Sequence, residues 1–312
     1  MKEELKKDIA EEINKIKHEK NVVFLAHFYQ LPEIQDLADY IGDSLALAQE
    51  AYKTQADIIL FAGVHFMAET AKILNPSKKV LIPDMNAGCS LADSCPADDL
   101  KKFMDAHPGH KVISYINCSA EVKVLSDVIC TSSNAVKIVQ SFPADQPLIF
   151  APDRNLGAWV NKMTGRNMLL WNGSCEVHDM LTTEMVVNLK IQHPDAKLIA
   201  HPECKAVILE MADYIGSTTA LLKYTMSDPA RKFIVATETG ILHQMKKNSP
   251  DKEFIIVPAD QTCSCNDCKY MKMSTLENIL HVLKEETNEI LLDPVLMEKA
   301  KKPILKMLEL SA

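Results

Sequence analysis

The sequence predicts an α/β protein made of three repeated α/β/α sandwich units, each with its own parallel sheet. Three observations support this fold class. A ten-residue segment recurs along the chain at 38–47, 126–135 and 212–221. Short apolar runs without polar alternation lie on both sides of every copy, which is typical of strands buried on both faces of a parallel sheet. Stretches of helical character separate these runs.

The copies of the repeat resemble one another residue by residue. The first begins Ala38-Asp39-Tyr40-Ile41-Gly42-Asp43-Ser44, and the third begins Ala212-Asp213-Tyr214-Ile215-Gly216-Ser217-Thr218. The middle copy keeps the acid, the apolar pair and a hydroxyl. Ser44, Ser132 and Thr218 therefore occupy equivalent places, at spacings of 88 and 86 residues. A repeat of this period indicates three copies of one structural unit.

Each unit is expected to contain three apolar strands with helices between them. We place the units at about residues 1–95, 96–179 and 180–275, followed by a helical C-terminal tail at 276–312. The strands are predicted at 22–27, 58–61 and 80–83, then at 112–117, 148–151 and 168–171, and finally at 198–201, 233–236 and 254–258. Ligands of open parallel sheets bind at the carboxyl ends of the strands. We therefore expect the three units to face one another around a pseudo-threefold axis, with their strand ends around one central site.

The composition excludes several classes of partner. The chain has 312 residues and a formal net charge of −8, so it lacks the basic surface with which proteins neutralise nucleic acid phosphates. No apolar stretch approaches the roughly 20 residues that cross a bilayer. The N-terminal segment is mixed in charge and has no apolar core, which argues against a signal peptide. We expect a cytoplasmic protein with small-molecule partners and no contact with nucleic acid or membrane.

The cysteines indicate a metal centre. The chain has nine, and in a reducing compartment such a number favours metal binding or catalysis over disulfides. One cysteine follows the last predicted strand of each unit, namely Cys89, Cys175 and Cys268, so we expect one centre shared by three units. Two alternatives stay open from spacing alone. Cys263, Cys265 and Cys268 could nucleate a zinc site, or the chain could hold no metal.

The other cysteines are expected to fill the core, because free cysteine is among the most buried residue types and packs as a small hydrophobe. This expectation applies to Cys95, Cys118, Cys130 and Cys204.

Six sequence blocks together resemble the quinolinate synthase family, and the resemblance runs nearly end to end. The blocks are Ala26-His27-Phe28-Tyr29-Gln30, Gly42-Asp43-Ser44, Pro83-Asp84-Met85 through Cys89, Tyr115-Ile116-Asn117 with Ser119-Ala120-Glu121-Val122-Lys123, His201-Pro202-Glu203-Cys204, and Cys268-Lys269-Tyr270-Met271-Lys272-Met273. Any single block is a weak signal, whereas the set is highly specific.

The resemblance implies a transferase of NAD biosynthesis that condenses iminoaspartate with dihydroxyacetone phosphate to quinolinate, with loss of phosphate and two waters. It implies three α/β domains around a central [4Fe-4S] cluster held by Cys89, Cys175 and Cys268, with Cys263 and Cys265 not serving as ligands. Three thiolates leave one iron open, and an open iron can act as a Lewis acid in dehydration. A functional link to an aspartate oxidase or dehydrogenase is also implied.

Three hydroxyl residues are predicted to bind the anionic substrates. Ser44, Ser132 and Thr218 open predicted helices, where a hydroxyl and free backbone N–H groups can receive an anion. For any one of them taken singly, simple N-capping is the alternative. Their threefold recurrence and the resemblance to the family favour substrate binding.

Further polar residues follow the predicted strands. His27 and His201 do so at matching places in the first and third units, where each could donate a hydrogen bond to a carboxylate or move a proton. The resemblance implies that both contact substrate, as do Tyr29, Tyr115 and Asn117. It further implies that Glu203 is the acid/base carboxylate, suited to enolisation and to the deprotonation before water loss, with Tyr29 and His201 assisting.

Some assignments remain open at this stage. His178 lies three residues after Cys175 and could contact a metal ligand or simply begin a helix. Lys123, Lys205 and Arg154 could assist anion binding electrostatically. Two other functions also compete: an iron–sulfur redox sensor that performs no chemistry on a metabolite, and a zinc-stabilised sugar-phosphate enzyme. The sensor would leave His27, Tyr29, Glu203 and the three hydroxyl residues unexplained.

Overall fold

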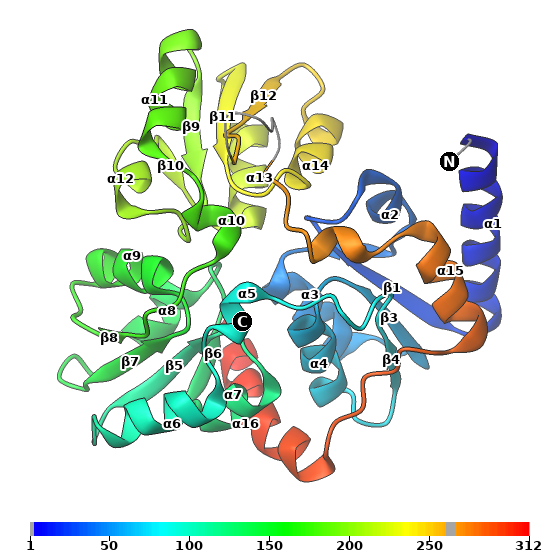
Figure 1. Ribbon diagram of the computed structural model, residues 1–312, viewed down its shortest axis with the longest axis horizontal. Coiled ribbons are helices and arrows are strands. Elements are labelled where there is room, and N and C mark those ends of the chain that lie inside the picture. The colour runs from blue at the N-terminus through cyan, green and yellow to red at the C-terminus, as the bar shows by residue number, and fades with distance from the viewer. Residues whose placement is uncertain (1–2, 260–265, 312) are drawn as a thin grey trace.

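The computed structural model describes residues 3–259 and 266–311, and within them the chain forms three sheets of four strands each (Figure 1). Every strand pair in the three sheets is parallel. The strand orders are β2-β1-β3-β4, β6-β5-β7-β8 and β10-β9-β11-β12, so a single order occurs three times. Helices alternate with the strands along the chain. The predicted α/β fold with three repeated parallel sheets is confirmed.

The first sheet and its helices occupy the N-terminal third of the chain. The elements are α1 (Glu3–Glu19), β1 (Val22–His27), α2 (Pro32–Leu37), β2 (Tyr40–Gly42), α3 (Ser44–Lys53), β3 (Ile58–Ala62), α4 (His65–Leu74), β4 (Lys79–Leu81) and α5 (Ser90–Asp93). Every residue of β1 and β3 is buried, because helices cover both faces of the sheet.

The second and third sheets repeat this order. The second comprises α6 (Ala97–Asp105), β5 (Lys111–Tyr115), α7 (Ala120–Leu125), β6 (Val128–Cys130), α8 (Ala135–Gln140), β7 (Leu148–Ala151), α9 (Arg154–Thr164), β8 (Leu169–Leu170) and α10 (Glu176–Asp179). The third comprises α11 (Thr183–Gln192), β9 (Lys197–Ala200), α12 (Ala206–Leu209), β10 (Tyr214–Ile215), α13 (Thr218–Ser227), β11 (Lys232–Ala236), α14 (Ile241–Asn248) and β12 (Glu253–Ile256).

The repeated segment contains a fourth strand in each sheet, which the sequence pattern did not predict. These strands, β2, β6 and β10, have only two or three residues, and each lies at the edge of its sheet. The repeated acid explains their position. Asp39 accepts a hydrogen bond from the backbone of Phe24 at 2.8 Å, and two equivalent bonds recur. They join Asp127 to Val112 at 2.8 Å and Asp213 to Leu198 at 2.7 Å.

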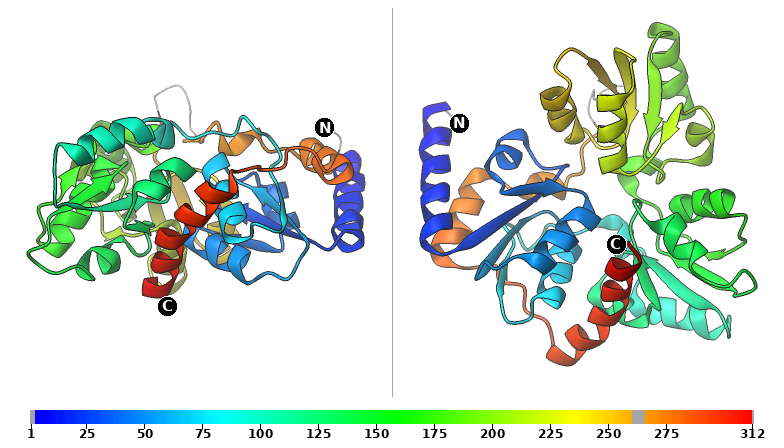
Figure 2. Two further views of the ribbon diagram at one scale, coloured as in Figure 1. Left: turned by 90° about the horizontal axis from the view of Figure 1, so that it is seen from below. Right: turned by 180° about the vertical axis from the view of Figure 1, so that it is seen from behind.

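The C-terminal segment packs against the first two sheets and their helices. It contains a 3₁₀ turn (η1, Met271–Met273), α15 (Leu276–Glu285) and α16 (Pro294–Ser311). Helix α15 packs on α1 in a cluster with Phe24 of β1. Helix α16 lies between the first and second sheets, against α4 on one side and α7 and α8 on the other (Figure 2). The domain boundaries given above stay a prediction.

Among the described helices, none has the length and apolar character that a membrane span requires.

Candidate active site and metal centre

Residues in or beside all three sheets, including those in the loops that connect their strands and helices, line one cavity. Its lining includes every residue predicted for the site: His27, Tyr29, Ser44, Cys89, Tyr115, Asn117, Ser132, Cys175, His201, Glu203, Thr218 and Cys268. Most of these residues follow a strand of one sheet or begin a helix beside it. The shared cavity therefore brings together side chains that lie far apart in the sequence.

The turns before α3, α8 and α13 contact one another directly. Ser133 Oγ is hydrogen-bonded to Asp43 Oδ2 and to Ser217 Oγ, at 2.8 Å each. These three residues belong to the three copies of the repeat, so all copies meet at one place. This contact places Ser44, Ser132 and Thr218 around the same end of the cavity.

The helix caps leave two of these hydroxyls free for other contacts. Asp43 and Ser217 cap α3 and α13 by accepting from Ala46 N and Ala220 N, at 3.1 and 3.3 Å. Ser44 and Thr218 are the first residues of these helices and line the cavity. The alternative that they act as simple N-caps is therefore wrong. A hydroxyl beside the first N–H groups of a helix is well placed to bind an anion.

The three predicted ligand cysteines each come just before a short helix or turn, α5, α10 and η1, and all are half-buried. Burial raises the pKa of Cys89 to about 12 and also raises the pKa values of Cys175 and Cys268. A buried thiol becomes a thiolate when a metal replaces its proton. Three thiols from three units on one cavity fit a metal group held by three cysteines.

A second set of donors lies beside Cys175. Its sulfur, a ring nitrogen of His178 and a carboxylate oxygen of Glu203 lie within 4.8 Å of one another. A single ion could use these donors, but it would occupy Glu203. A multi-iron group instead uses sulfurs that are spread around the cavity, as Cys89, Cys175 and Cys268 are.

Glu203 is almost fully buried, and its two carboxylate oxygens have different surroundings. Oε2 lies 2.7 Å from His178 Nδ1 and 3.8 Å from His201 Nδ1, whereas Oε1 has no hydrogen-bond partner among the described residues. Burial works to raise the pKa of this carboxyl, but His178 and the hydrogen bonds from His178 and Tyr115 lower it more, so the net shift is downward. Glu203 is therefore a carboxylate near neutral pH, with a buried Oε1 and with the Tyr115 phenol beside the carboxylate.

His178, which the sequence left open, contacts Glu203 directly. Its ring stacks on that of His201, with the centroids 4.9 Å apart. Its Nε2 lies 3.0 Å from Thr237 Oγ1. His178 thus orients the carboxylate and does more than begin α10.

The two strand-end histidines are held in the same way. His27 Nδ1 accepts from the N–H of Tyr29 at 3.1 Å, and His201 Nδ1 accepts from the N–H of Glu203 at 3.4 Å. Burial lowers the pKa of His27 to about 4 and that of His201 to about 3. Both rings are therefore neutral near pH 7, with the proton on Nε2. Each can donate that proton in a hydrogen bond, and His201 Nε2 lies 3.1 Å from Ser132 Oγ.

Two tyrosines face Glu203 from the first and second sheets. Burial raises the pKa of Tyr29 and of Tyr115 well above the ordinary value, and the nearby Glu203 charge raises both further. Tyr29 Oη is hydrogen-bonded to Thr237 Oγ1 at 2.9 Å and to Thr218 Oγ1 at 3.1 Å. Both phenols therefore keep their protons and can act as hydrogen-bond donors or acids.

Two residues at the end of β11 were missed by the sequence analysis. Thr237 and Glu238 directly follow Ala236, and both are fully buried. The sequence signal that could have identified them is their position directly after an apolar strand, where His27 and His201 also occur. Glu238 lines the cavity, and burial raises the pKa of its carboxyl.

The basic residues proposed as helpers do not line the cavity. Arg154 pairs with Asp179 at 3.2 Å, Lys123 is buried against the carbonyl of Cys118, and Lys205 precedes α12.

The other described cysteines behave as predicted. Cys95, Cys118, Cys130 and Cys204 are buried in hydrophobic clusters, which confirms them as core residues. Cys263 and Cys265 lie outside the described residues.

Comparisons with known proteins give a consistent result. The family model described as quinolinate synthetase A protein matches residues 11–309. A quinolinate synthase of Microcystis aeruginosa is 58% identical over 304 residues, which cover 97% of this chain and 95% of that protein. Those of Nostoc punctiforme and Synechocystis sp. are each 57% identical, over 308 and 309 residues. Each alignment covers 99% of this chain, and 95% and 97% of the respective relative.

Proposed function

This chain belongs to the quinolinate synthetase A family, and from that premise we propose that it condenses iminoaspartate with dihydroxyacetone phosphate. The product would be quinolinate, formed with loss of phosphate and two waters, and the enzyme would be a transferase. Quinolinate synthesis belongs to NAD biosynthesis. The observation that carries the proposal is the single cavity in which three cysteines, three hydroxyls, two tyrosines and Glu203 converge.

The metal group of the proposal is a [4Fe-4S] cluster held by Cys89, Cys175 and Cys268. Their placement on one cavity, from three separate units, supports this ligand set. When bound with three protein ligands, such a cluster supplies an open iron that can act as a Lewis acid toward a leaving hydroxyl.

The anionic groups of the substrates would lie at the end of the cavity where the repeats meet. Ser44 and Thr218 begin α3 and α13, and their hydroxyls and the first N–H groups of these helices can receive a carboxylate or phosphate. Ser132 stands beside them and is linked to His201. His27 can add a donor from Nε2, and Asn117 an amide. Neutral donors would thus hold the anions, since no arginine or lysine is among the described residues that line the cavity.

Glu203 would act as the acid/base group. Glu203 lines the cavity, and its lowered pKa keeps it ionised, so it can take a proton from a carbon next to a carbonyl. His178 holds the carboxylate in place through its Nδ1. Tyr29 and Tyr115 keep their phenolic protons and can protonate a departing or carbonyl oxygen. These roles serve the enolisation, ring closure and dehydration that the overall reaction requires.

The proposed functional partner of the enzyme follows from the chemistry of its substrates. Iminoaspartate must come from an enzyme that oxidises aspartate, so we propose a functional link to an aspartate oxidase or dehydrogenase. The cytoplasmic location expected from the sequence remains part of the proposal.

Two measurements test the function. Anaerobic purification should give a brown protein with about four iron and four sulfide per chain. The same protein, supplied with aspartate, an aspartate oxidase and dihydroxyacetone phosphate, should form quinolinate. A colourless zinc protein would contradict the cluster, and an iron protein that forms no quinolinate would contradict the substrates.

A further inference from the structure

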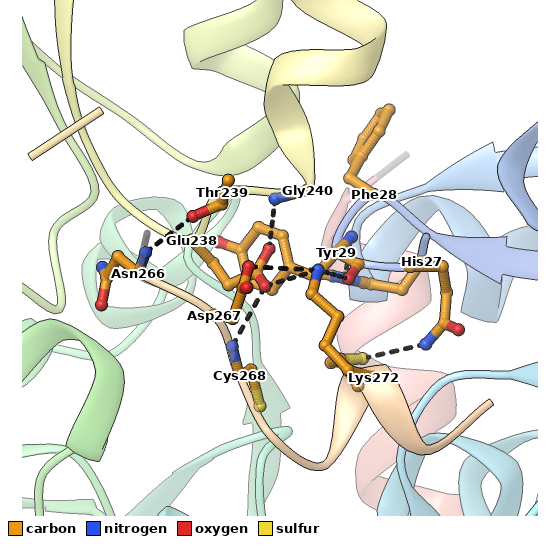
Figure 3. Close-up of polar contacts among 12 residues, drawn as sticks. His27, Phe28, Tyr29, Glu238, Thr239, Gly240, Asn266, Asp267, Cys268 and Lys272 are labelled. Carbon is orange, nitrogen blue, oxygen red and sulfur yellow. Dashed lines mark hydrogen bonds and ion pairs between the residues drawn. The ribbon is translucent and has the colours of Figure 1, made fainter. Parts of the chain in front are cut away.

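A buried carboxylate beside the cavity has no part in the proton transfers assigned above. Glu238 is fully buried, and a buried charge is costly unless it is paired and hydrogen-bonded. Its Oε1 accepts from the N–H of Cys268 at 3.1 Å and lies 2.8 Å from Lys272 Nζ. Its Oε2 accepts from the N–H of Gly240 at 2.6 Å. Figure 3 shows these contacts converging on the one carboxylate.

Lys272 extends the network to another part of the molecule. Its Nζ donates to the carbonyl of Tyr29 at 2.6 Å (Figure 3). Tyr29 follows β1 of the first sheet, whereas Glu238 follows β11 of the third. One ammonium group therefore joins the carboxylate that holds Cys268 to the backbone of Tyr29. Asp267 lies farther from it, at 3.7 Å, and is exposed.

The turn that carries Glu238 also packs directly on Tyr29. A Cβ at Gly240 would lie 2.7 Å from Tyr29 Cα and 2.8 Å from its carbonyl carbon, and backbone atoms cannot yield as a flexible side chain could. Gln35 is fully buried and donates to the carbonyls of Gly240 and Phe28, at 3.0 and 2.8 Å. The backbone around Tyr29 is thus held both by Lys272 and by the turn of Glu238.

We propose that Glu238 and Lys272 are positioning residues that place Cys268 and Tyr29 relative to each other. The inference rests on the proposed function, because that function makes Cys268 a cluster ligand and Tyr29 an acid/base partner. A carboxylate is needed at 238, since its two oxygens accept three donors. The NH₂ group of a glutamine would meet at least one of these donors and could accept from none. A cation is needed at 272, because it donates to both a carboxylate and a carbonyl.

The test compares four variants of the full-length protein, purified anaerobically. Glu238→Gln should lower kcat about 10- to 100-fold, with little change in KM, because residues behind a metal ligand commonly contribute this much. It should also lower the iron content or change the electron paramagnetic resonance spectrum of the reduced cluster. Lys272→Met should keep the iron but lower kcat, since it removes the bond to Tyr29. Lys272→Arg should restore much of the activity.

Asp267→Asn is the matched control, because Asp267 faces the same ammonium from the exposed side. It should leave the iron content, spectrum and kcat unchanged. Glu238→Gln with full iron, an unchanged spectrum and wild-type kcat would overturn the inference, as would equal losses in Asp267→Asn. If Glu238→Gln does not fold, Lys272→Met decides the test. Wild-type turnover in Lys272→Met would overturn the inference, whereas a lower kcat with full iron content would support it.

Measurements on the wild-type protein distinguish failure of this inference from failure of the proposed function. A wild type without iron or quinolinate formation overturns both. A wild type with both properties, next to unaffected Glu238 and Lys272 variants, overturns the positioning role alone.

Discussion

At the scale of single residues, Glu203 differs from an ordinary buried carboxylate because its two oxygens have separate surroundings. Oε2 is held by His178, whereas Oε1 is buried and makes no side-chain hydrogen bond of good geometry among the described residues. The Tyr115 phenol, which keeps its proton, lies beside this carboxylate and can donate to it.

The first prediction concerns this residue. Glu203→Gln keeps the shape of the side chain but removes the base, so kcat should fall by about 10²- to 10⁴-fold while substrate analogues still bind. Steady-state quinolinate formation and calorimetric binding of a dicarboxylate analogue measure the two effects. Glu184→Gln, on the exposed side of α11, should change neither. Near-normal turnover in Glu203→Gln would remove the residue from the mechanism.

The second prediction concerns the hydroxyl of Thr237, which joins Tyr29 Oη to His178 Nε2. Because His178 Nδ1 faces Glu203, the Thr237 hydroxyl can donate to Nε2 of the same ring and in turn accept from Tyr29. Thr237→Val removes this link at nearly constant volume and should lower kcat about 10-fold, the equivalent of one good hydrogen bond.

Thr237→Ser restores the hydroxyl and should recover most of the rate in the same assay. Equal rates in Thr237→Val and the wild type would show that the three side chains act independently.

At the scale of secondary structure, the repeat is explained by one recurring hydrogen bond. Asp39, Asp127 and Asp213 each accept from the backbone of the first strand of their sheet, and thereby hold the short edge strand that leads to the cavity. The acid thus supports the turn that carries the hydroxyl proposed to bind substrate, and it does not itself line the cavity.

The third prediction follows from this bond. Asp127→Ala leaves the N–H of Val112 without its side-chain acceptor and should lower the free energy of unfolding by about 1–3 kcal/mol. Asp127→Asn keeps an acceptor oxygen and should lose less. Denaturant unfolding of the two variants beside the wild type measures the difference. A loss from Asp127→Asn as large as that from Asp127→Ala would indicate that charge, and not the hydrogen bond, is what matters.

At the scale of the whole molecule, α16 holds two units together. Its buried residues, including Ile304 and Met307, pack between α4 of the first unit and α7 and α8 of the second. Asn134 Nδ2 also donates to Ser311 Oγ at 2.7 Å, next to the turn before α8. Helix α16 therefore contacts the turn that also carries Ser132, a residue of the cavity lining.

The fourth prediction tests this support. Ile304→Ala removes a fully buried side chain from the packed interface and should cost about 2–5 kcal/mol of unfolding free energy. Val295→Ala lies on the same helix but is largely exposed, so it should change stability by less than about 0.5 kcal/mol. Thermal or denaturant unfolding of both variants provides the comparison. Equal effects would mean that α16 packs loosely in solution.

The sequence predicted the repeated fold and the lining of the cavity because both depend on patterns within each unit. The apolar run at 22–27 forms β1, and Ser44, Ser132 and Thr218 all line one cavity. The sequence could not show β2, since three residues are too few to give a periodic signal.

The missed site residues depend on contacts across the fold. His178 was uncertain because its partner, Glu203, belongs to another sheet. The sequence did not indicate Glu238, because its carboxylate accepts hydrogen bonds from the backbone N–H groups of Gly240 and Cys268. Bonds to backbone groups cannot be read from the residue types involved. Tertiary partners of this kind appear only when the chain is folded.

The placement of the three cysteines proposed as ligands has a topological consequence. A group bound to Cys89, Cys175 and Cys268 would act as a cross-link that closes two loops of the chain, of 86 and 93 residues by difference of their numbers. Closing long loops removes much of the freedom of the unfolded chain. Binding of such a group and folding of the chain would then be coupled, and losing the group would lower the stability of all three units together.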